Sequence, residues 1–171
     1  MRTVVLGERP EALEEFIARR QALGQDVFDE IWDGEYHVVP GPSAEHGRVE
    51  DELSALLRPM ARAAGLVRTG PFNLGTRDDY RVPDAGFHRG SPTGVYLPTA
   101  AVVVEVVSPN DETYLKIDFY ASHGVEEFVV ADPQLRSVRS WQLVDGALVE
   151  TGRSDLLGAD ATELTRDIAW P

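Results

Sequence analysis

The chain has 171 residues, no cysteine and a formal net charge of −13, from 29 acidic and 16 basic side chains. With 43% hydrophobic residues it can bury one substantial core, so we expect residues 1–171 to form a single domain. The lack of cysteine excludes a disulfide framework, and no apolar run has the length of a membrane span, which together predict a cytoplasmic protein with no membrane partner.

The first predicted elements are a surface helix and a β-hairpin. A helix is expected over residues 10–23 and should end at Gly24. Asp33 and Gly34 then separate two runs with strand character, which is the signature of a tight turn. Residues 27–39 are therefore predicted to form the hairpin.

A longer amphipathic helix is expected over residues 44–64, with a kink at Pro59. Its predicted apolar face consists of Val49, Leu53, Leu56, Met60 and Ala64. His46 falls within this apolar sector, and Glu50 lies one turn later at its edge. Such a pair is a candidate to extend a metal site or to orient a water molecule, and the alternative is a structural hydrogen bond.

The next segments contain the first candidate metal ligand. Residues 65–75 are predicted to form a strand and residues 77–80 a turn. Residues 80–87 also have strand character, but their proline and glycine restrict them to a bend or an edge. This segment carries Asp84. Because Pro-Asp is also a common turn dipeptide, the dipeptide alone does not identify a site.

A buried strand with one acidic residue comes next. Residues 100–107 are rich in β-branched side chains on both alternating faces, which predicts a central strand covered on both sides. Glu105 interrupts this run and must be compensated by a cation, a metal or a proton. If its strand pairs with that of Asp84, the two carboxylates form an oxygen-rich site that suits Mg²⁺ or Mn²⁺. The alternative for Glu105 is a structural ion pair with an arginine.

Lys116 is the only lysine in a chain that has fifteen arginines. An ammonium is a compact charge whose pKa burial can lower, and a guanidinium does not replace it in a tight site. The segment 108–123 is predicted to be a helix that places Lys116 at the margin of its buried face, within reach of Asp84 and Glu105. The alternative is an ordinary surface cation.

The rest of the chain is predicted to be rich in strands. Residues 126–131 should form another core strand, and residues 137–143 and 147–150 a second hairpin around an Asp-Gly turn. The expected fold is α/β, a mixed sheet of about five or more strands flanked by helices, with an N-terminal helix and hairpin.

The net charge bears on the partner. An acidic protein is repelled by phosphates at long range, so a nucleic-acid partner requires a local basic rim around the site. The candidate residues for this rim are Arg58, Arg62, Arg68, Arg77, Arg81 and Arg89. The alternative for these arginines is ordinary solvated surface. Trp32, Tyr36 and Trp141 are candidates for a homodimer interface, which core packing explains equally well.

Several segments together resemble a known family. The motifs are Val82-Pro83-Asp84, Val104-Glu105-Val106-Val107-Ser108-Pro109, Lys116 with Tyr120, Gly124-Val125 and residues 127–133, with Trp32-Asp33-Gly34-Glu35 and His46 upstream. They resemble the Uma-two family of restriction-endonuclease-like proteins, within the PD-(D/E)XK nuclease superfamily. The resemblance implies a PD-(D/E)XK fold with Asp84 and Glu105 as metal ligands.

The resemblance also implies a role for the lysine. In the superfamily a lysine commonly lies two residues after the glutamate, but Val107 occupies that position here. The resemblance then implies a migrated lysine, Lys116, donated from the following helix.

The expected function is a Mg²⁺- or Mn²⁺-dependent endonuclease that hydrolyses phosphodiester bonds of nucleic acid. Asp84, Glu105 and Lys116 are the expected catalytic residues, and the carbonyl of Val106 helps Asp84 and Glu105 to hold the metal. Two alternatives remain: a non-catalytic nuclease-fold module for binding or regulation, which the net charge favours, and a hydrolase of a small phosphorylated substrate.

Overall fold

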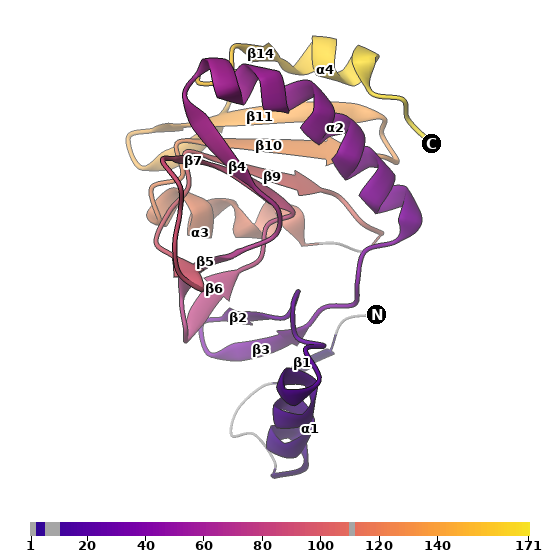
Figure 1. The fold of residues 1–171 in the computed structure, drawn as a ribbon, viewed down its shortest axis with the longest axis vertical. Coiled ribbons are helices and arrows are strands. Elements are labelled where there is room, and N and C mark those ends of the chain that lie inside the picture. The colour runs from indigo at the N-terminus through magenta and orange to yellow at the C-terminus, as the bar shows by residue number, and fades with distance from the viewer. Residues whose placement is uncertain (1–2, 6–10, 110–111) are drawn as a thin grey trace.

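The computed structural model describes residues 3–5, 11–109 and 112–171, whose strands form two six-stranded sheets and one two-stranded pair (Figure 1). The N-terminal sheet has the order β1 (Thr3–Val5), β3 (Glu35–Val38), β2 (Glu30–Trp32), β6 (Asp79–Arg81), β5 (Asn73–Thr76) and β8 (Tyr96–Leu97). The central sheet has the order β12 (Ala147–Glu150), β11 (Ser137–Val144), β10 (Glu127–Asp132), β9 (Val102–Val106), β7 (Ala85–Arg89) and β4 (Leu66–Thr69). The pair consists of β13 (Arg153–Ser154) and β14 (Ala159–Asp160).

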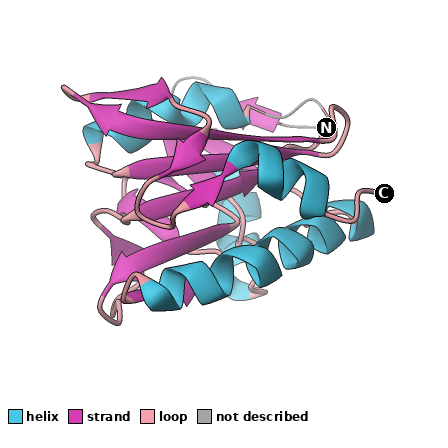
Figure 2. Ribbon diagram, turned by 90° about the horizontal axis from the view of Figure 1, so that it is seen from above, coloured by secondary structure: helices cyan, strands magenta, loops and turns pink. Residues whose placement is uncertain are grey.

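The helices are α1 (Glu11–Ala22), α2 (Ala44–Ala63), the 3₁₀ turn η1 (Thr113–Lys116), α3 (Ile117–Ser122) and α4 (Ala161–Asp167). Helix α1 lies beside β1 of the N-terminal sheet, whereas the others cover the two faces of the central sheet (Figure 1). Helices α2 and α4 lie on one face and α3 on the other (Figure 1), and the view from above shows helices outside the strand layers (Figure 2). Over the described ranges no helix combines the length and the apolar character that a membrane crossing requires.

Strand β9 is the centre of this arrangement. It pairs in parallel with β10 and antiparallel with β7, which makes the sheet mixed. Val102, Val104 and Val106 belong to the core under α2, whereas Val103 packs on the α3 side. All of β9 is buried, so the predicted central strand is confirmed. Because side chains alternate along a strand, Glu105 lies on the α3 side with Val103.

The predicted N-terminal helix and hairpin are also confirmed. Helix α1 is followed by Gly24, which has a φ of 62°. Strands β2 and β3 pair across a two-residue turn in which Asp33 and Gly34 have φ values of 50° and 87°. Two successive positive φ angles match the twist of a hairpin, which is why Asp-Gly sequences favour this turn.

Helix α2 has nearly the predicted bounds but a different buried face. Pro59 lies inside the helix without ending it. The buried apolar residues are Val49, Leu53, Leu57 and Ala61, one every four positions. The predicted Leu56 and Met60 are only partly buried, and Ala64 is exposed, so that part of the prediction was wrong. A row of residues at spacing four is the ridge that packs against the sheet.

Two predicted strands are each divided between the sheets. The single strand expected over residues 65–75 is wrong, because β4 belongs to the central sheet and β5 to the N-terminal sheet. Residues 80–87 are divided in the same way between β6 and β7. Pro71 and Pro83 lie at the two crossings, where a residue without an amide donor ends the ladder. Asp84 therefore lies between sheets.

The helix predicted over residues 108–123 begins later than expected. Residues 108 and 109 are not helical, residues 110 and 111 lie outside the described ranges, and η1 precedes a short α3. Gly124, with a φ of 69°, follows its end. Strand β10 and the β11–β12 hairpin confirm the predictions for the following segments. The C-terminal β13, β14 and α4 were not predicted.

Candidate metal-binding and catalytic site

The pairing of β7 with β9 brings Asp84 and Glu105 to the same end of the central sheet. Ala85 pairs with Val104, so Asp84 and Glu105 occupy the next positions along the two chains. The Oδ2 atom of Asp84 accepts a hydrogen bond of 2.7 Å from the Val106 amide. This side chain thus extends the ladder where Pro83 interrupts regular pairing.

Lys116 is buried between two carboxylates. Its Nζ lies 3.0 Å from Glu105 Oε1 and 2.9 Å from Glu30 Oε1, and the residue is 8% exposed. The prediction that Lys116 lies at the margin of the buried face was wrong. The preceding Leu115 faces solvent with 67% exposure, whereas Tyr120, one turn after Lys116, is fully buried. The buried stripe of this segment therefore carries the lysine itself.

Glu105 is held by two donors on one oxygen. In addition to Lys116, the Tyr120 hydroxyl donates a hydrogen bond of 2.5 Å to Oε1. Among the residues that the structure describes, none donates a hydrogen bond to Glu105 Oε2. An acidic oxygen in a buried environment without a donor requires a proton or a cation.

Glu30 is a site residue that sequence reasoning missed. It lies on β2, is 3% exposed and accepts a 2.7 Å hydrogen bond from the Val82 amide in addition to its bond with Lys116. In the sequence it is an acid two residues from Phe28 on one side and from Trp32 on the other, and this apolar spacing is the local signal of its burial.

His46 belongs to the site, whereas Glu50 does not. His46 Nε2 lies 3.0 Å from Asp84 Oδ1, and Nδ1 lies 2.9 Å from Ser108 Oγ. Glu50 instead accepts a hydrogen bond of 2.8 Å from Ser54 and forms an ion pair with Arg68. Although the two side chains are neighbours on one helix face, the bonds of Glu50 to Ser54 and Arg68 keep it out of the site.

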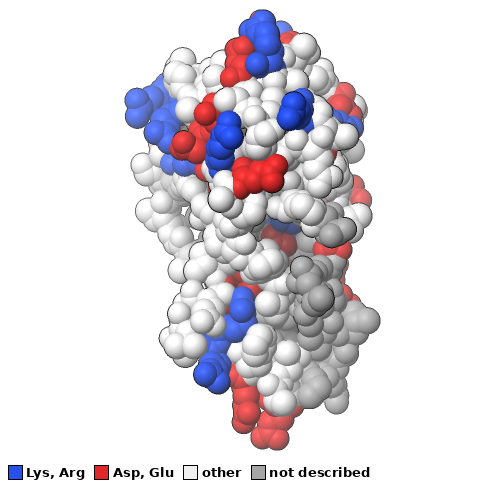
Figure 3. Space-filling model, turned by 90° about the vertical axis from the view of Figure 1, so that its right-hand side faces the viewer, with Lys and Arg blue, Asp and Glu red and all other residues white. Residues whose placement is uncertain are grey.

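These residues line one cavity of about 440 Å³ between the two sheets. Its acidic lining residues are Glu30, Asp84, Glu105 and Glu112. Lys116, His46, Val106 and Ser108 line it as well. In Figure 3 acidic and basic side chains lie recessed between the upper and lower parts of this face.

Arginine does not contribute to the described lining of this cavity. Of the predicted basic rim, Arg68 is paired with Glu50, and Arg89 is paired with Glu126. Arg81 is buried, with 5% exposure. Acidic side chains therefore predominate around this cavity.

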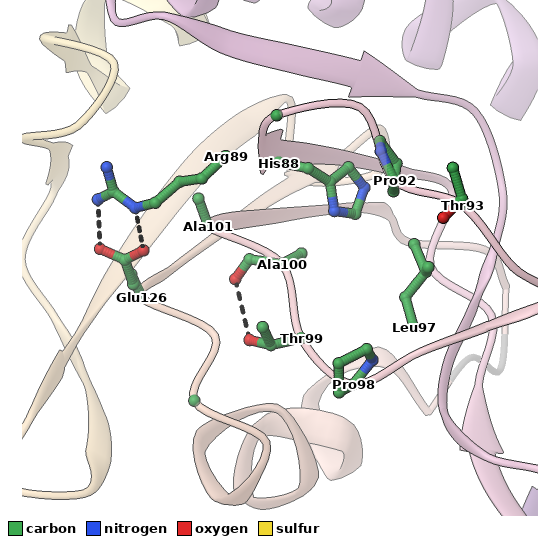
Figure 4. Close-up of a pocket in the computed structure, with 12 residues that line it drawn as sticks. His88, Arg89, Pro92, Thr93, Leu97, Pro98, Thr99, Ala100, Ala101 and Glu126 are labelled. Carbon is green, nitrogen blue, oxygen red and sulfur yellow. Dashed lines mark hydrogen bonds and ion pairs between the residues drawn. The ribbon is translucent and has the colours of Figure 1, made fainter.

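A second, more open cavity of about 320 Å³ lies at the opposite end of β7 (Figure 4). Arg89 and Glu126 form a two-bonded ion pair there, at 2.9 and 2.8 Å. Because these charges compensate each other, this cavity lacks the excess of carboxylates that defines the first one. His88, which also lines it, has a pKa lowered by burial.

Burial shifts the pKa values of the ionisable side chains that line the first cavity. Desolvation raises the pKa of Glu105 to about 8; Lys116 opposes this, and the carboxylates of Asp84 and Glu30 add to it. Burial by itself would lower the pKa of Lys116, but the charges of Glu105 and Glu30 outweigh it and raise that pKa above its usual value. The cluster has more carboxylates than cations and therefore retains an extra proton near neutral pH.

This extra proton predicts how stability depends on pH. The pKa of Glu105 is raised from 4.5 to about 8 on folding, so the stability from its bound proton is fully present below pH 4.5 and lost as the pH rises to about 8. We expect the metal-free protein to lose melting temperature over this interval. Glu105→Gln, which mimics the protonated carboxyl, should flatten the dependence in thermal melts.

The matched control is Glu127→Gln, because Glu127 is also buried but bonds Ser154 and the Leu156 amide. Parallel curves for the wild type and Glu105→Gln would show that Glu105 binds no extra proton.

The donor set fits a hard divalent cation. Asp84, Glu105 and the carbonyl of Val106 offer only oxygen, which such cations prefer. Within the described ranges, no group of three or more His, Asp or Glu side chains is arranged to hold a metal by itself. Two carboxylates with water completing the shell is a common arrangement for a small cation that keeps several of its waters.

Comparison with known proteins agrees with this fold. The Uma2 family, described as "Putative restriction endonuclease", matches residues 13–168. The crystal structure of "a putative nuclease belonging to DUF820" from Anabaena variabilis ATCC 29413 is similar, with a TM-score of 0.63 and 14% sequence identity, over 82% of this chain and 90% of that chain. No curated protein matches at a significant level. The predicted restriction-endonuclease-like fold is confirmed.

Proposed function

Because the chain belongs to the Uma2 family, we propose that it is a nuclease that hydrolyses phosphodiester bonds of nucleic acid and depends on Mg²⁺ or Mn²⁺. One observation carries the proposal: the buried Glu105 of a central strand lies beside Asp84 and is bonded to the only lysine of the chain. Two carboxylates and a lysine are suited to phosphodiester hydrolysis.

Each side chain has a distinct role in this proposal. Asp84 and Glu105, with the carbonyl of Val106, would hold the cation. A bound divalent cation supplies Lewis acidity and neutralises phosphate charge. The ammonium of Lys116 stabilises negative charge that develops on the phosphate. Tyr120 fixes one oxygen of Glu105 and leaves the other for the cation.

His46 supports Asp84 from the opposite side. Its Nε2 contacts the oxygen of Asp84 that the Val106 amide does not use. With Ser108 at its other nitrogen, the ring holds the orientation of this carboxylate. We propose further that residues 1–171 act as one domain, since the cavity takes Glu30 from one sheet and Glu105 from the other.

A cleavage assay tests the proposal. Purified protein is incubated with single- and double-stranded DNA and RNA in Mg²⁺, Mn²⁺, Ca²⁺ or a chelator, at low and moderate salt. We expect cleavage with Mg²⁺ or Mn²⁺ and none with the chelator, because the acidic cavity repels phosphate until a cation neutralises it. Asp84→Asn, purified in parallel, controls for contaminating nucleases, and equal cleavage by this variant would assign the activity to a contaminant.

A non-catalytic binding module is the second candidate, favoured by the net charge of −13 and by the described lining of the cavity, which has no arginine. No cleavage under any of these conditions would support it. A gel-shift titration of the same nucleic acids, with and without divalent cation, then shows whether this fold binds them at all.

A further inference from the structure

A stack of five side chains joins the N-terminal hairpin to the segment that carries the lysine. The rings of His37 and Trp32 are stacked with centroids 4.4 Å apart. The guanidinium carbon of Arg81 lies 4.5 Å from the Trp32 ring centroid and 3.9 Å from that of Phe119. Phe119 and His123 continue the stack with centroids 4.0 Å apart. The stack thus runs from β3 to α3.

Arg81 is the middle layer and is not free to bind phosphate. It is 5% exposed, and its Nη1 donates to the Ile31 carbonyl at 2.7 Å and to Asp79 at 2.8 Å. Aromatic rings contact it on both sides, and cation–π contacts of a desolvated guanidinium are stabilising. Arg81 therefore acts as a rigid spacer between the hairpin and α3.

One hydrogen bond connects the stack to Glu30 in the cavity, which Trp32 and His37 also line. The indole Nε1 of Trp32 donates to Glu30 Oε2 at 2.6 Å. The other oxygen of Glu30 accepts from the Val82 amide and from Lys116. Three donors bond this buried carboxylate and occupy both of its oxygens, in contrast to Glu105, whose Oε2 has no donor among the described residues. Glu30 is therefore arranged to hold the ammonium of Lys116 and not to bind a metal ion.

A lysine side chain requires such a support. Its flexible four-carbon stem has many rotamers, and a single acceptor does not fix the ammonium. Two acceptors on different sheets, Glu30 on β2 and Glu105 on β9, hold Nζ from both sides at 2.9 and 3.0 Å. We propose that Glu30 and Trp32 are positioning residues that fix Lys116 in the reactive arrangement. The expected effect on cleavage rests on the proposed function, whereas the fixed position of the ammonium does not.

The single lysine makes the test selective. Protein labelled with ¹⁵N-lysine has one side-chain ammonium signal, that of Lys116. In the metal-free wild type we expect slow exchange of the ammonium protons with water, because Nζ is buried and doubly bonded. Trp32→Phe preserves an aromatic layer but removes the indole donor, and Glu30→Gln removes the charge. Each variant should accelerate exchange of the ammonium protons by about tenfold, which corresponds to the free energy of one hydrogen bond.

Glu127→Gln again serves as the matched control, since this buried carboxylate bonds residues of the C-terminal segment and not Lys116. It should leave the ammonium signal unchanged. If Glu30→Gln does not fold, the exchange measurement on Trp32→Phe alone tests the proposal. The proposal would be overturned if the ammonium protons of folded Trp32→Phe or of folded Glu30→Gln exchanged with water at the wild-type rate.

Kinetics provide the second measurement. We expect Glu30→Gln to lower kcat about tenfold and to leave KM and Mn²⁺ affinity close to wild type, because it displaces Lys116 but removes no metal ligand. A loss of Mn²⁺ affinity as large as that of Glu105→Gln would make Glu30 a ligand and overturn its positioning role. Absence of nuclease activity in the wild type would contradict the proposed function. The exchange rate of the Lys116 ammonium would still decide whether Glu30 and Trp32 position this lysine.

Discussion

Asp84→Asn and Glu105→Gln will each lower Mn²⁺ affinity and cleavage by at least about 10²-fold. Each substitution removes one of the two cavity carboxylates that the proposed function assigns to the cation, while the amide preserves the shape of the side chain. At position 84 the amide oxygen still accepts the hydrogen bond from Val106. Isothermal calorimetry with Mn²⁺ and single-turnover cleavage measure the two losses separately.

Glu50→Gln is the control for this experiment. Glu50 lies on α2 one turn after His46 but is bonded to Ser54 and Arg68 outside the cavity, so its removal should leave Mn²⁺ binding intact. Metal should also raise the melting temperature of the wild type and not of the two cavity variants, since a ligand that binds only the folded state stabilises it. Unchanged Mn²⁺ binding in both Asp84→Asn and Glu105→Gln would remove this pair as the metal site.

Lys116→Arg will lower the cleavage rate by about 10²- to 10³-fold, the cost of losing one positioned charge-stabilising donor. Lys116 is 8% exposed and bonded to Glu30 and Glu105. A planar guanidinium does not occupy this space with the same contacts. Lys116→Met, which keeps the length but removes the charge, should be at least as inactive. Cleavage rates at saturating metal test both variants.

Melting curves must accompany these rates, because both substitutions are in a buried cluster. The matched control is Arg153→Lys, an exchange between the same residue types at an exposed position. Wild-type cleavage by Lys116→Arg would return Lys116 to the role of a structural cation.

The successful predictions came from local features of the sequence. Asp33-Gly34 requires positive φ angles, so the hairpin was predictable. An acid within a β-branched run is costly, so Glu105 was recognisable as a compensated residue. The composition singles out Lys116 as the one lysine of the chain, and the structure joins it to Glu105.

The parts that could not be predicted depend on distant contacts. Glu30 resembles any acid on an alternating strand until its partner, 86 residues away, is known. The division of residues 65–75 between two sheets depends on which strands lie beside them, because local strand propensity does not specify a partner. The burial of Lys116 has the same origin, since the hairpin that covers it is distant in sequence.

The parallel pairing of β9 with β10 also has a consequence for biosynthesis. Strand β9 gains its parallel neighbour only when β10, which ends at Asp132, has been synthesised. The entropy cost of closing a long loop comes before the favourable contacts of such a pairing form, so we expect β9 and β10 to become ordered late in folding. A chain still emerging from the ribosome therefore lacks the ordered β9 that carries Glu105, and the cluster of Glu30, Glu105 and Lys116 assembles only after this strand is in place.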